Sequence, residues 1–497
     1  MILHGASPVE RAGELLPRLG DQDLKVRYEA KMDLQRLCLA AAAPGHEAER
    51  QPLALWLADQ ALRRDADRLV RLWLLRQIEY IGRAETLPAL AALLQDEDPE
   101  VRECARRALE RNPAPDAVRV LLDALAGALE SGADARWRIG LVHSVGLRAA
   151  GSAVADRCVP LLERALADEA TRDEAARALG HVGTPRAWQV LEDAMNRVPE
   201  AARALIEAAR SAEPDQAREL YEVVWRECIH RGPRAAALVG LAKLDPEGAA
   251  PLVREALEAP DPWVRHTALN AAEAMGGLGQ DVLVEALPGV PDETAVQIVG
   301  RLGGEAQEAL ADLLAEPSEA VRLAAIQRLG EVGDAACVGP LLDRATAGSK
   351  DEAALARRAL RQLGGRPVDR VLREVVSGAE DVPKAWRETA LQALVDRNAP
   401  GVGGLLLELV RKHEELREPA IQGLARVGAD DEFLPLAEEV MAAPSREGWR
   451  ALEQIAARVE NGPALAEALI QRADGDREKL RALLGTLARL GGAKAIE

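Results

Sequence analysis

Cysteine and histidine side chains are the most versatile nucleophiles, bases and metal ligands of proteins, and this chain has five of the first and seven of the second. The cysteines are odd in number, lie far apart and fall mostly within helical patterns, with no CxxC pair to chelate zinc. This spacing is typical of small core residues in a reducing compartment. His181, in the segment LGHVG, lies at a predicted helix end where a cation suits the helix dipole, so a capping role is favoured over that of a base. The cysteines are Cys38, Cys104, Cys158, Cys228 and Cys337, and the histidines are His4, His46, His143, His181, His230, His266 and His413.

The motifs of the common catalytic sites are absent from the sequence. There is no GxSxG, Walker-type or HExxH motif and no Cys–His pairing. The glycine-rich string GVGG at 401–404 lacks the strand that a dinucleotide-binding loop requires. An oxidoreductase or a nucleotide hydrolase is therefore not expected, and the sequence predicts neither a catalytic residue nor a cofactor.

Length and composition indicate which elements must position any site. The 497 residues exceed the roughly 250–300 at which a single hydrophobic core stops growing, so the chain forms several domains or a stack of repeats. Ala, Leu, Arg and Glu dominate, and aromatic residues make up only 2% with a single Phe. This composition favours helices over sheets, and it predicts an all-α protein.

Charge and hydropathy limit the possible partners. The net charge of −18 repels a phosphate backbone unless one face concentrates its Arg residues, so nucleic acid is not expected as a partner. The most apolar stretches, such as LALWLADQAL, are interrupted by charges well short of a membrane span, so membrane insertion is not expected either. A cytoplasmic location is predicted, although the sequence leaves open a signal peptide removed before Met1.

A unit of roughly 30 residues repeats along the chain: an apolar-periodic helix, a short acidic turn, a second helix and a closing Gly. In the clearest copy, Val101, Ala105, Ala108 and Leu109 fall at i, i+4, i+7 and i+8, which is one helix stripe that a neighbouring unit must cover. Asp98 and Pro99 are suited to the start of this second helix. Clear copies occupy 85–112, 159–183, 248–277 and 305–333, and Gly82, Gly146, Gly330 and Gly428 are predicted to end second helices as left-handed caps.

The turn DxDPxVR, followed by an Ala- and Leu-rich helix that ends in LG, resembles HEAT repeats, specifically the short bacterial kind first named for phycobilin lyases. The resemblance covers essentially the whole chain. It implies an all-α fold, an α-α superhelix in the form of a right-handed solenoid of about fifteen two-helix repeats. We expect a single solenoid over 1–497. The final residues AKAIE look like the first turn of another repeat, which leaves open a longer natural chain.

The resemblance also bears on two enzyme classes of HEAT-like build. His46-Glu47 and His413-Glu414 are similar to the His-Glu pairs that facing second helices present in di-iron hydroxylases. Here His46 lies in a predicted loop and His413 in a predicted first helix, so the pairs are not equivalent and no metal site is expected. A DNA glycosylase is not expected because Lys is sparse and acids outnumber bases.

An Arg recurs directly after the apolar anchor of the second helix. In the family this Arg and the turn Asp of adjacent repeats form a ladder, so the resemblance implies a structural role. Trp73, Trp137, Trp386 and Trp449 are assigned to the anchor position that Val101 holds elsewhere, as core residues. The recurring arginines are Arg27, Arg102, Arg138, Arg265, Arg322, Arg387 and Arg450.

Residues two and five positions after the anchor are predicted to point away from the core stripe, toward the groove that second helices line. Each second helix contributes one such pair of residues, here called a rung. Two of the four rungs are apolar, which suits a peptide or helix of a partner docking beside Arg106. The alternative is that irregular repeats tilt and bury these residues. The rungs are Tyr28 and Lys31, Leu75 and Ile78, Glu103 and Arg106, and Ile139 and Val142.

The favoured function is therefore a non-catalytic scaffold or adaptor that binds a protein or peptide on the concave face of a HEAT solenoid. The alternative is a lyase-like handler of a chromophore or cofactor, or the repeat portion of a longer enzyme. The identity of the partner and the oligomeric state stay open.

Overall fold

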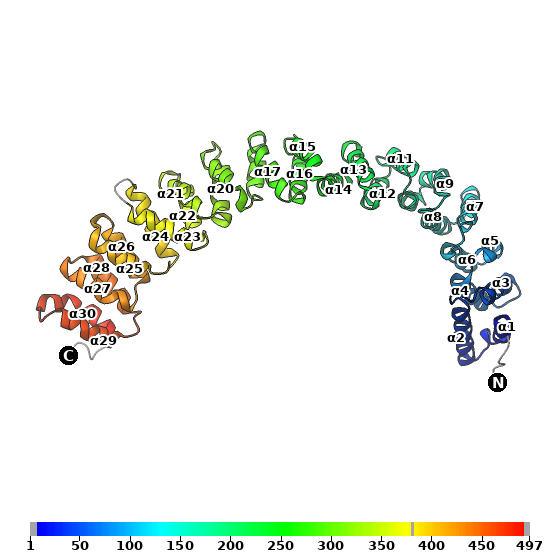
Figure 1. Cartoon of the computed structure of the whole chain (residues 1–497), viewed down its shortest axis with the longest axis horizontal. Helices are drawn as coiled ribbons and strands as arrows, with labels where there is room; N and C mark the ends of the chain where they lie inside the picture. The colour runs from blue at the N-terminus through cyan, green and yellow to red at the C-terminus, as the bar shows by residue number, and fades with distance from the viewer. Residues whose placement is uncertain (1–6, 379–381, 492–497) are drawn as a thin grey trace. The chain divides into compact units, whose positions relative to one another are not determined.

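The computed structural model describes residues 7–378 and 382–491, and within these ranges the regular structure consists of α-helices and short 3-10 turns, without a strand. The all-α prediction is thus confirmed. The chain divides into two compact units, Met1–Ala249 and Ala250–Glu497, each built from helix pairs (Figure 1). The expectation of one continuous right-handed solenoid over 1–497 stays a prediction.

In the first unit, odd-numbered and even-numbered helices alternate as first and second helices of successive repeats. Each first helix packs against the second helix that follows it, and each second helix packs against the next second helix, as in the series from α2 to α14. The helices are α1 (Pro8–Leu19), α2 (Leu24–Ala41), α3 (Glu47–Leu62), α4 (Arg68–Ile81), α5 (Leu87–Leu93), α6 (Pro99–Arg111), α7 (Ala117–Glu130), α8 (Ala135–Ala149), α9 (Ala155–Ala167), α10 (Arg172–Val182), α11 (Pro185–Ala194), α12 (Pro199–Ser211), α13 (Pro214–Glu227) and α14 (Arg231–Leu244).

The second unit continues the pattern of first and second helices. The second helices from α18 to α30 again pack in series, each against its neighbour. Helix α15 (Pro246–Leu257) spans the boundary, and the others are α16 (Pro262–Ala274), α17 (Gly277–Ala286), α18 (Asp292–Val299), α19 (Gln307–Asp312), α20 (Glu319–Val332), α21 (Val338–Ala347), α22 (Lys350–Gln362), α23 (Arg366–Ser377), α24 (Lys384–Asp396), α25 (Val402–Lys412), α26 (Glu414–Val427), α27 (Asp430–Ala442), α28 (Arg446–Ala456), α29 (Gly462–Arg472) and α30 (Arg477–Gly491).

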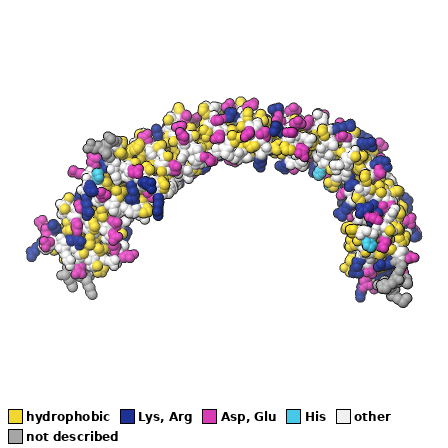
Figure 2. Space-filling view, in the orientation of Figure 1, with side chains coloured by type: hydrophobic (Ala, Val, Ile, Leu, Met, Phe, Trp, Pro, Cys, Tyr) yellow, Lys and Arg dark blue, Asp and Glu magenta, His cyan; other side chains and the backbone are white. Residues whose placement is uncertain are grey.

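Local sequence explains where a second helix begins and which of its faces is buried. Asp98 is the N-cap of α6 and accepts a hydrogen bond from the backbone N–H of Glu100 at 2.8 Å, with Pro99 as the first helical residue. The predicted stripe of this helix, from Val101 to Leu109, is buried as expected. Charged side chains remain outside, and Figure 2 shows Lys and Arg interspersed with Asp and Glu along the visible surface. Within the described ranges, none of the helices is long and apolar enough to cross a membrane.

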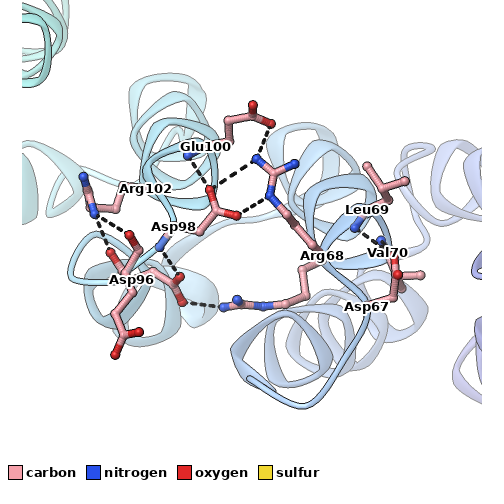
Figure 3. Close-up of polar contacts among 10 residues, drawn as sticks. Asp67, Arg68, Leu69, Val70, Asp96, Asp98, Glu100 and Arg102 are labelled. Atoms are coloured by element: carbon pink, nitrogen blue, oxygen red, sulfur yellow. Dashed lines mark hydrogen bonds and ion pairs between the residues drawn. The ribbon is translucent and has the colours of Figure 1, made fainter.

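The fourth residue of nine of the described second helices is an Arg, and several of these arginines tie their own repeat to the next one; Figure 3 shows Arg102 of α6 with the acidic turn that precedes it. In α4, Arg71 donates to the carbonyl oxygen of Ala61 at 2.9 Å and to the carboxylate of Asp96, in the next repeat, at 2.5 Å. In α6, Arg102 donates to the carbonyl oxygen of the same Asp96 at 2.7 Å. The last carbonyl groups of a first helix have no N–H donor within the helix. The arginine side chains donate the hydrogen bonds that these carbonyl groups would otherwise lack.

This ladder extends beyond the arginines that the sequence pattern had indicated. Of the predicted arginines, Arg138 pairs with the turn Asp of the next repeat, Asp168, as the resemblance implied. Arg102, Arg265, Arg322 and Arg387 are structural in another way, because each donates to a backbone carbonyl of its own repeat. Further members at the same position are Arg71, Arg234 and Arg417. Arg450 was assigned wrongly, because it is the fifth residue of α28 and lies exposed.

The Trp residues depart from the predicted anchor register in two helices, α4 and α28; in α28 the assignment of Trp449 was wrong, because it is the fourth residue and the third is the buried Gly448. Trp137 and Trp386 are the third residues of α8 and α24, as Val101 is of α6, and they are half-buried. Trp73 is the sixth residue of α4, whose third residue is the buried Val70, so its assignment as an anchor was wrong. The physical cause is that Leu and Val at several neighbouring positions of α4 make its apolar stripe wide enough to fit more than one register.

Glycines at the ends of second helices serve close packing rather than left-handed capping. Gly146 and Gly330 lie inside α8 and α20, where a Cβ atom would meet the Cα atoms of Ala178 and Ala359 at 2.7 and 2.8 Å. Gly82 and Gly428 do cap their helices, with φ of −68° and −62°, so no left-handed backbone is required there. The prediction of left-handed caps was therefore wrong at all four positions. The glycines instead let successive second helices approach closely.

Candidate binding grooves between second helices

A cavity of about 610 Å³ lies on the first unit between the second helices α10 and α12. Arg177 and His181 of α10 form one wall, and Arg203 and Glu207 of α12 form the other. The floor is made of small residues: a Cβ atom at Gly180 would lie only 3.3 Å from the Cβ atom of Ala204. The remaining lining residues are Ala150, Gly183, Trp188, Glu200, Ala208, Ser211, Ala212, Glu213 and Gln216.

A second cavity, of about 350 Å³, lies on the second unit between α22 and α24. Arg357 and Arg361 of α22 face residues of α24 across it. The residues of α24 that line it are the fifth, sixth, ninth, tenth and thirteenth of the helix, and the same five positions of α12 line the first cavity. In α24 these residues are Glu388, Thr389, Gln392, Ala393 and Asp396, and in α12 they are Arg203, Ala204, Glu207, Ala208 and Ser211.

The repeat itself accounts for a groove at this place. Residues that are three, four and seven positions apart lie on one face of an α-helix, so positions five, nine and thirteen form a row along the helix axis. This row is directed away from the core stripe and flanks the line of contact with the preceding second helix. Since small residues stand at the contact itself, a shallow groove remains between successive rows.

Ion pairs surround the first groove, and one of them, between Arg177 of α10 and Glu200 of α12, crosses it. Glu174 of α10 lies 2.9 Å from Nδ1 of His143, on α8, and 2.6 Å from Arg177. Arg203 lies 3.0 Å from Glu200, and Arg177 reaches the same carboxylate at 3.8 Å. Burial raises the pKa of Glu174, but hydrogen bonds from His143 and Arg177 outweigh it and hold that pKa below its usual range. The wall of the groove is therefore charged at neutral pH.

Trp188 contributes an unsatisfied donor to the first groove. The side chain lines the cavity and is 9% exposed, and its indole Nε1–H has no hydrogen-bond partner among the residues that the structure describes. An indole N–H is a donor only, so it can pair with a carbonyl, a carboxylate or water but not with the neighbouring guanidinium groups.

The side chains available for chemistry are held in inert environments. Burial raises the pKa of the Cys158 thiol to about 11 and that of Cys38 to about 12, which disfavours the reactive thiolate. Among the described residues, no group of three or more His, Cys, Asp or Glu side chains could hold a metal ion. His46 precedes α3, in a loop as predicted, whereas His413 lies between α25 and α26 and not within a first helix.

The structure divides the predicted rungs into exposed and buried residues. The fifth residues of their helices reach the surface: Tyr28 is exposed, Glu103 is at the border of exposure and Ile139 is 37% exposed. Lys31 is half-buried and lies 5.3 Å from the ring centre of Trp73. The prediction was wrong for the other four: Leu75, Ile78, Val142 and Arg106 are buried, so they do not form an apolar groove.

The burial of these four residues has a geometric cause. The anchor is the third residue of its helix, so the residue five positions later is the eighth. This eighth residue faces the adjacent second helix. Arg106 shows this directly, because its guanidinium contacts Ser144 and lies 3.1 Å from the Cβ position of Gly140, both on α8. Leu75 and Ile78 were placed with Trp73 as the anchor, and they are the eighth and eleventh residues of α4, which belong to the packed face.

The row that the sequence pattern missed is the ninth residue of the second helices, one position beyond the buried eighth. It is exposed and polar in α4, α6, α8, α12, α20, α22, α24 and α26. The indication in the sequence was a charged or amide side chain that recurs six positions after the anchor, within helices otherwise rich in Ala and Leu. In these eight helices the ninth residues are Arg76, Arg107, His143, Glu207, Gln327, Arg358, Gln392 and Gln422.

Comparisons with known proteins found one matching family model and a set of similar solved structures. A family model described as HEAT repeats matches residues 57–140. No curated protein matches the chain. Solved structures that match include a homology model of the full-length AP-3 complex in an intermediate open conformation, at 12% identity over 98% of this chain and 91% of that one, with a TM-score of 0.39.

Two further structural matches differ in how much of each chain they cover. The crystal structure of Kap121p matches at 14% identity and a TM-score of 0.30, over 97% of this chain but 56% of its own, so the present chain spans little more than half of it. The complex of CpcE and CpcF of phycocyanin lyase from Nostoc sp. PCC7120 matches at 18% identity over 54% of this chain and 94% of that one, with a TM-score of 0.26. Residues 57–140 are HEAT repeats, and stacked helix pairs of the same all-α kind make up the remainder of the described chain.

Proposed function

We propose that this chain is a non-catalytic adaptor that binds a protein or peptide along the face formed by its second helices. The observation that supports the proposal is the recurrence of one groove at equivalent helix positions, between α10 and α12 and between α22 and α24. A surface that repeats with the fold offers similar contacts at regular intervals, which suits an elongated partner that crosses several repeats.

The chemistry of the lining supports recognition rather than bond making. Each groove combines small apolar residues with charged walls, and its volume is suited to a few side chains of a partner. Around the first groove the ionisable groups already pair with one another, as Arg177 does with Glu174 and Arg203 with Glu200. Such pairs can exchange partners with an incoming polar chain, whereas a catalytic base or nucleophile requires an unpaired, activated group.

The test is selection of peptides from a randomised display library on the full chain. Peptides that occupy the first groove should lose at least about tenfold in affinity when Arg203→Glu and Glu207→Lys are combined, because both side chains are exposed and line it. Arg186→Glu is the matched control, since Arg186 is exposed on the first helix α11 and does not line the groove.

Selected peptides that tolerate the groove variants but lose binding with Arg186→Glu would place the partner on the first-helix face and overturn the proposal. An absorption band of a bound pigment in the purified protein would also contradict it, because that result favours the alternative of a chromophore or cofactor handler. Unchanged melting temperatures of all variants would show that lost affinity does not reflect unfolding.

A further inference from the structure

On the second-helix face of the first unit, each of the helices α4, α6, α8, α10 and α12 carries an exposed basic side chain, although the protein as a whole is acidic. Arg76, Arg107 and His143 are the ninth residues of α4, α6 and α8. Arg177 is the equivalent residue of α10, because it precedes Gly180 by three positions as His143 precedes Gly146. With Arg203 of α12, the five residues Arg76, Arg107, His143, Arg177 and Arg203 form what we call the basic stripe.

Three carboxylates of this face, Glu79, Glu174 and Glu200, lie beneath its cations, whereas Glu207 of α12 is exposed. Side chains of Glu79, Glu174 and Glu200 are only 11%, 13% and 19% exposed. By contrast, Arg107 is 59% exposed and Arg203 is 68% exposed. The basic side chains therefore stand outermost above Glu79, Glu174 and Glu200, and a partner approaching these positions from solvent first meets guanidinium and imidazole groups.

Helix α8 adds an apolar element to the middle of the stripe. Ile139 and Leu147 lie four residues before and four residues after His143, on the same helix face, and they are 37% and 42% exposed. These two large hydrophobic side chains flank the imidazole of the stripe, and Tyr80 of α4 is a further exposed aromatic side chain on this face. A partner that crosses α8 can thus bury an apolar side chain there, between contacts made by its acidic groups on either side.

The spacing of the rungs indicates an extended peptide. Packed helices lie about 8–10 Å apart, and an extended chain advances about 3.3 Å per residue, so every third residue of the partner meets a new repeat. A nucleic-acid strand fits less well, because every nucleotide carries a phosphate charge and the buried carboxylates would repel the phosphates between rungs.

We propose that the basic stripe binds an extended acidic segment of a partner protein, with a carboxylate at every third residue and an apolar residue where the segment crosses α8. This inference rests on the proposed function, which it makes specific for partner chemistry. Arginine suits the role because its planar guanidinium can release one carboxylate and accept another in the same bidentate geometry.

The experiment uses a fluorescein-labelled peptide of thirteen residues, Glu-Gly-Ser-Glu-Gly-Ser-Leu-Gly-Ser-Glu-Gly-Ser-Glu, and fluorescence anisotropy with the full chain. We expect binding that weakens as salt is raised, and a loss of about tenfold for Arg107→Glu and for Ile139→Asp. Arg186→Glu on α11 should leave the affinity unchanged. Circular dichroism and thermal melts of each variant check that the helices remain folded.

Three further probes separate the alternatives. A peptide with Lys at each Glu position should bind at least tenfold more weakly, and so should a peptide of the same composition with its four Glu residues adjacent. An oligothymidylate of thirteen nucleotides should bind more weakly than the acidic peptide. Equal binding of the Lys peptide, tighter binding of the oligonucleotide, or no binding of the acidic peptide would each overturn the inference.

These outcomes are distinguishable from failure of the proposed function. If library peptides occupy the second-helix face without acidic residues at this spacing, the adaptor function stands and the basic stripe is a solvated face of paired charges. If selected peptides avoid the second-helix face altogether, both proposals fail.

Discussion

Replacing Arg322 with Met is expected to destabilise the junction between α20 and α22. In the folded chain Arg322 Nε lies 2.7 Å from Glu352 Oε1, and the guanidinium also donates to the carbonyl oxygens of Glu316 and Pro317. Glu352 is only 2% exposed, so its carboxylate has little water to replace the lost partner. Removing one partner of a buried ion pair costs about 3–5 kcal/mol.

Two neighbouring groups reduce this cost. Arg344 Nη1 lies 3.9 Å from Glu352 Oε2, and the backbone N–H of Ser349 donates to the same oxygen at 3.3 Å. Both contacts persist in the variant and retain part of the stabilisation of the carboxylate. We therefore expect a loss of about 2–4 kcal/mol, toward the lower end of the range for buried pairs.

The pH dependence of the loss gives a second measurement. Burial raises the pKa of Glu352, but hydrogen bonds from Arg322 and from the backbone of Ser349 outweigh it and lower that pKa below the ordinary 4.5. In the native chain the carboxylate thus contributes stability above about pH 4.5, and this contribution is lost as the pH falls through its folded pKa. In the variant the pKa should rise, so the destabilisation should shrink as the pH approaches 4.5 from neutrality.

Urea denaturation at pH 7.5 and pH 5, followed by circular dichroism, measures the loss. Because repeat proteins need not unfold in one step, hydrogen exchange of α20 and α22 provides the local readout. In the double variant Arg322→Met with Glu352→Gln the buried charge is absent, so about half of the loss or more should be recovered. Equal stability of the single and double variants would refute the reasoning, since the unpaired charge would then not be the cause.

Three other outcomes follow from burial, packing and thiol chemistry. Val142→Asp should lower stability by about 3 kcal/mol or more because the side chain is fully buried, whereas Ile139→Asp on the same helix should cost about 1 kcal/mol, and thermal melts of the two compare them. Gly146→Ala should destabilise by about 1–3 kcal/mol because its Cβ atom would meet the next second helix at 2.6 Å, while Gly127→Ala, with open space around it inside α7, should stabilise by about 0.5–1 kcal/mol in urea titrations. Cys158, whose pKa burial raises to about 11, should resist iodoacetamide at pH 8 until the protein is unfolded, as intact mass spectrometry would show; rapid alkylation of the native protein would contradict its buried position.

The fold could be predicted from the sequence pattern because every repeat contains residues that mark where its helices begin and which of their faces is buried. Asp98 and Pro99 mark the start of α6, and the apolar spacing of Val101 and Leu109 marks its buried face. These features act within one helix or between neighbours in sequence, so they can be recognised without knowledge of distant contacts. The recurring Arg could be predicted for the same reason, since its acceptors lie at the end of the helix that precedes it.

The candidate site was harder to predict because one residue of helix separates a buried position from an exposed one. Val142 and His143 are adjacent in sequence, but a rotation of about 100° turns the first toward a neighbouring helix and the second toward solvent. Which of the two is buried depends on where the adjacent second helix packs, and that contact lies about 30 residues away. Close approaches such as that of Gly146 to Ala178 set this position, and the periodicity of a single helix carries no information on them.

Helix α6 shows how far residue type alone falls short. Within six residues it carries Arg102, Arg106 and Arg107, whose side chains are chemically identical. Arg102 donates to carbonyl oxygens of its own repeat, and Arg106 is buried against Ser144 of α8 and pairs with Glu103 and Glu110.

Arg107 pairs with Glu103 at 2.9 Å from a position that is 59% exposed. Only this last guanidinium can change its partner without breaking the stack, because losing an exposed pair costs at most about 1 kcal/mol whereas losing a buried one costs several. The same argument applies to each second helix in turn. Mutations at the fourth and eighth positions should therefore affect folding first, and mutations at the ninth should affect binding while the helices remain intact.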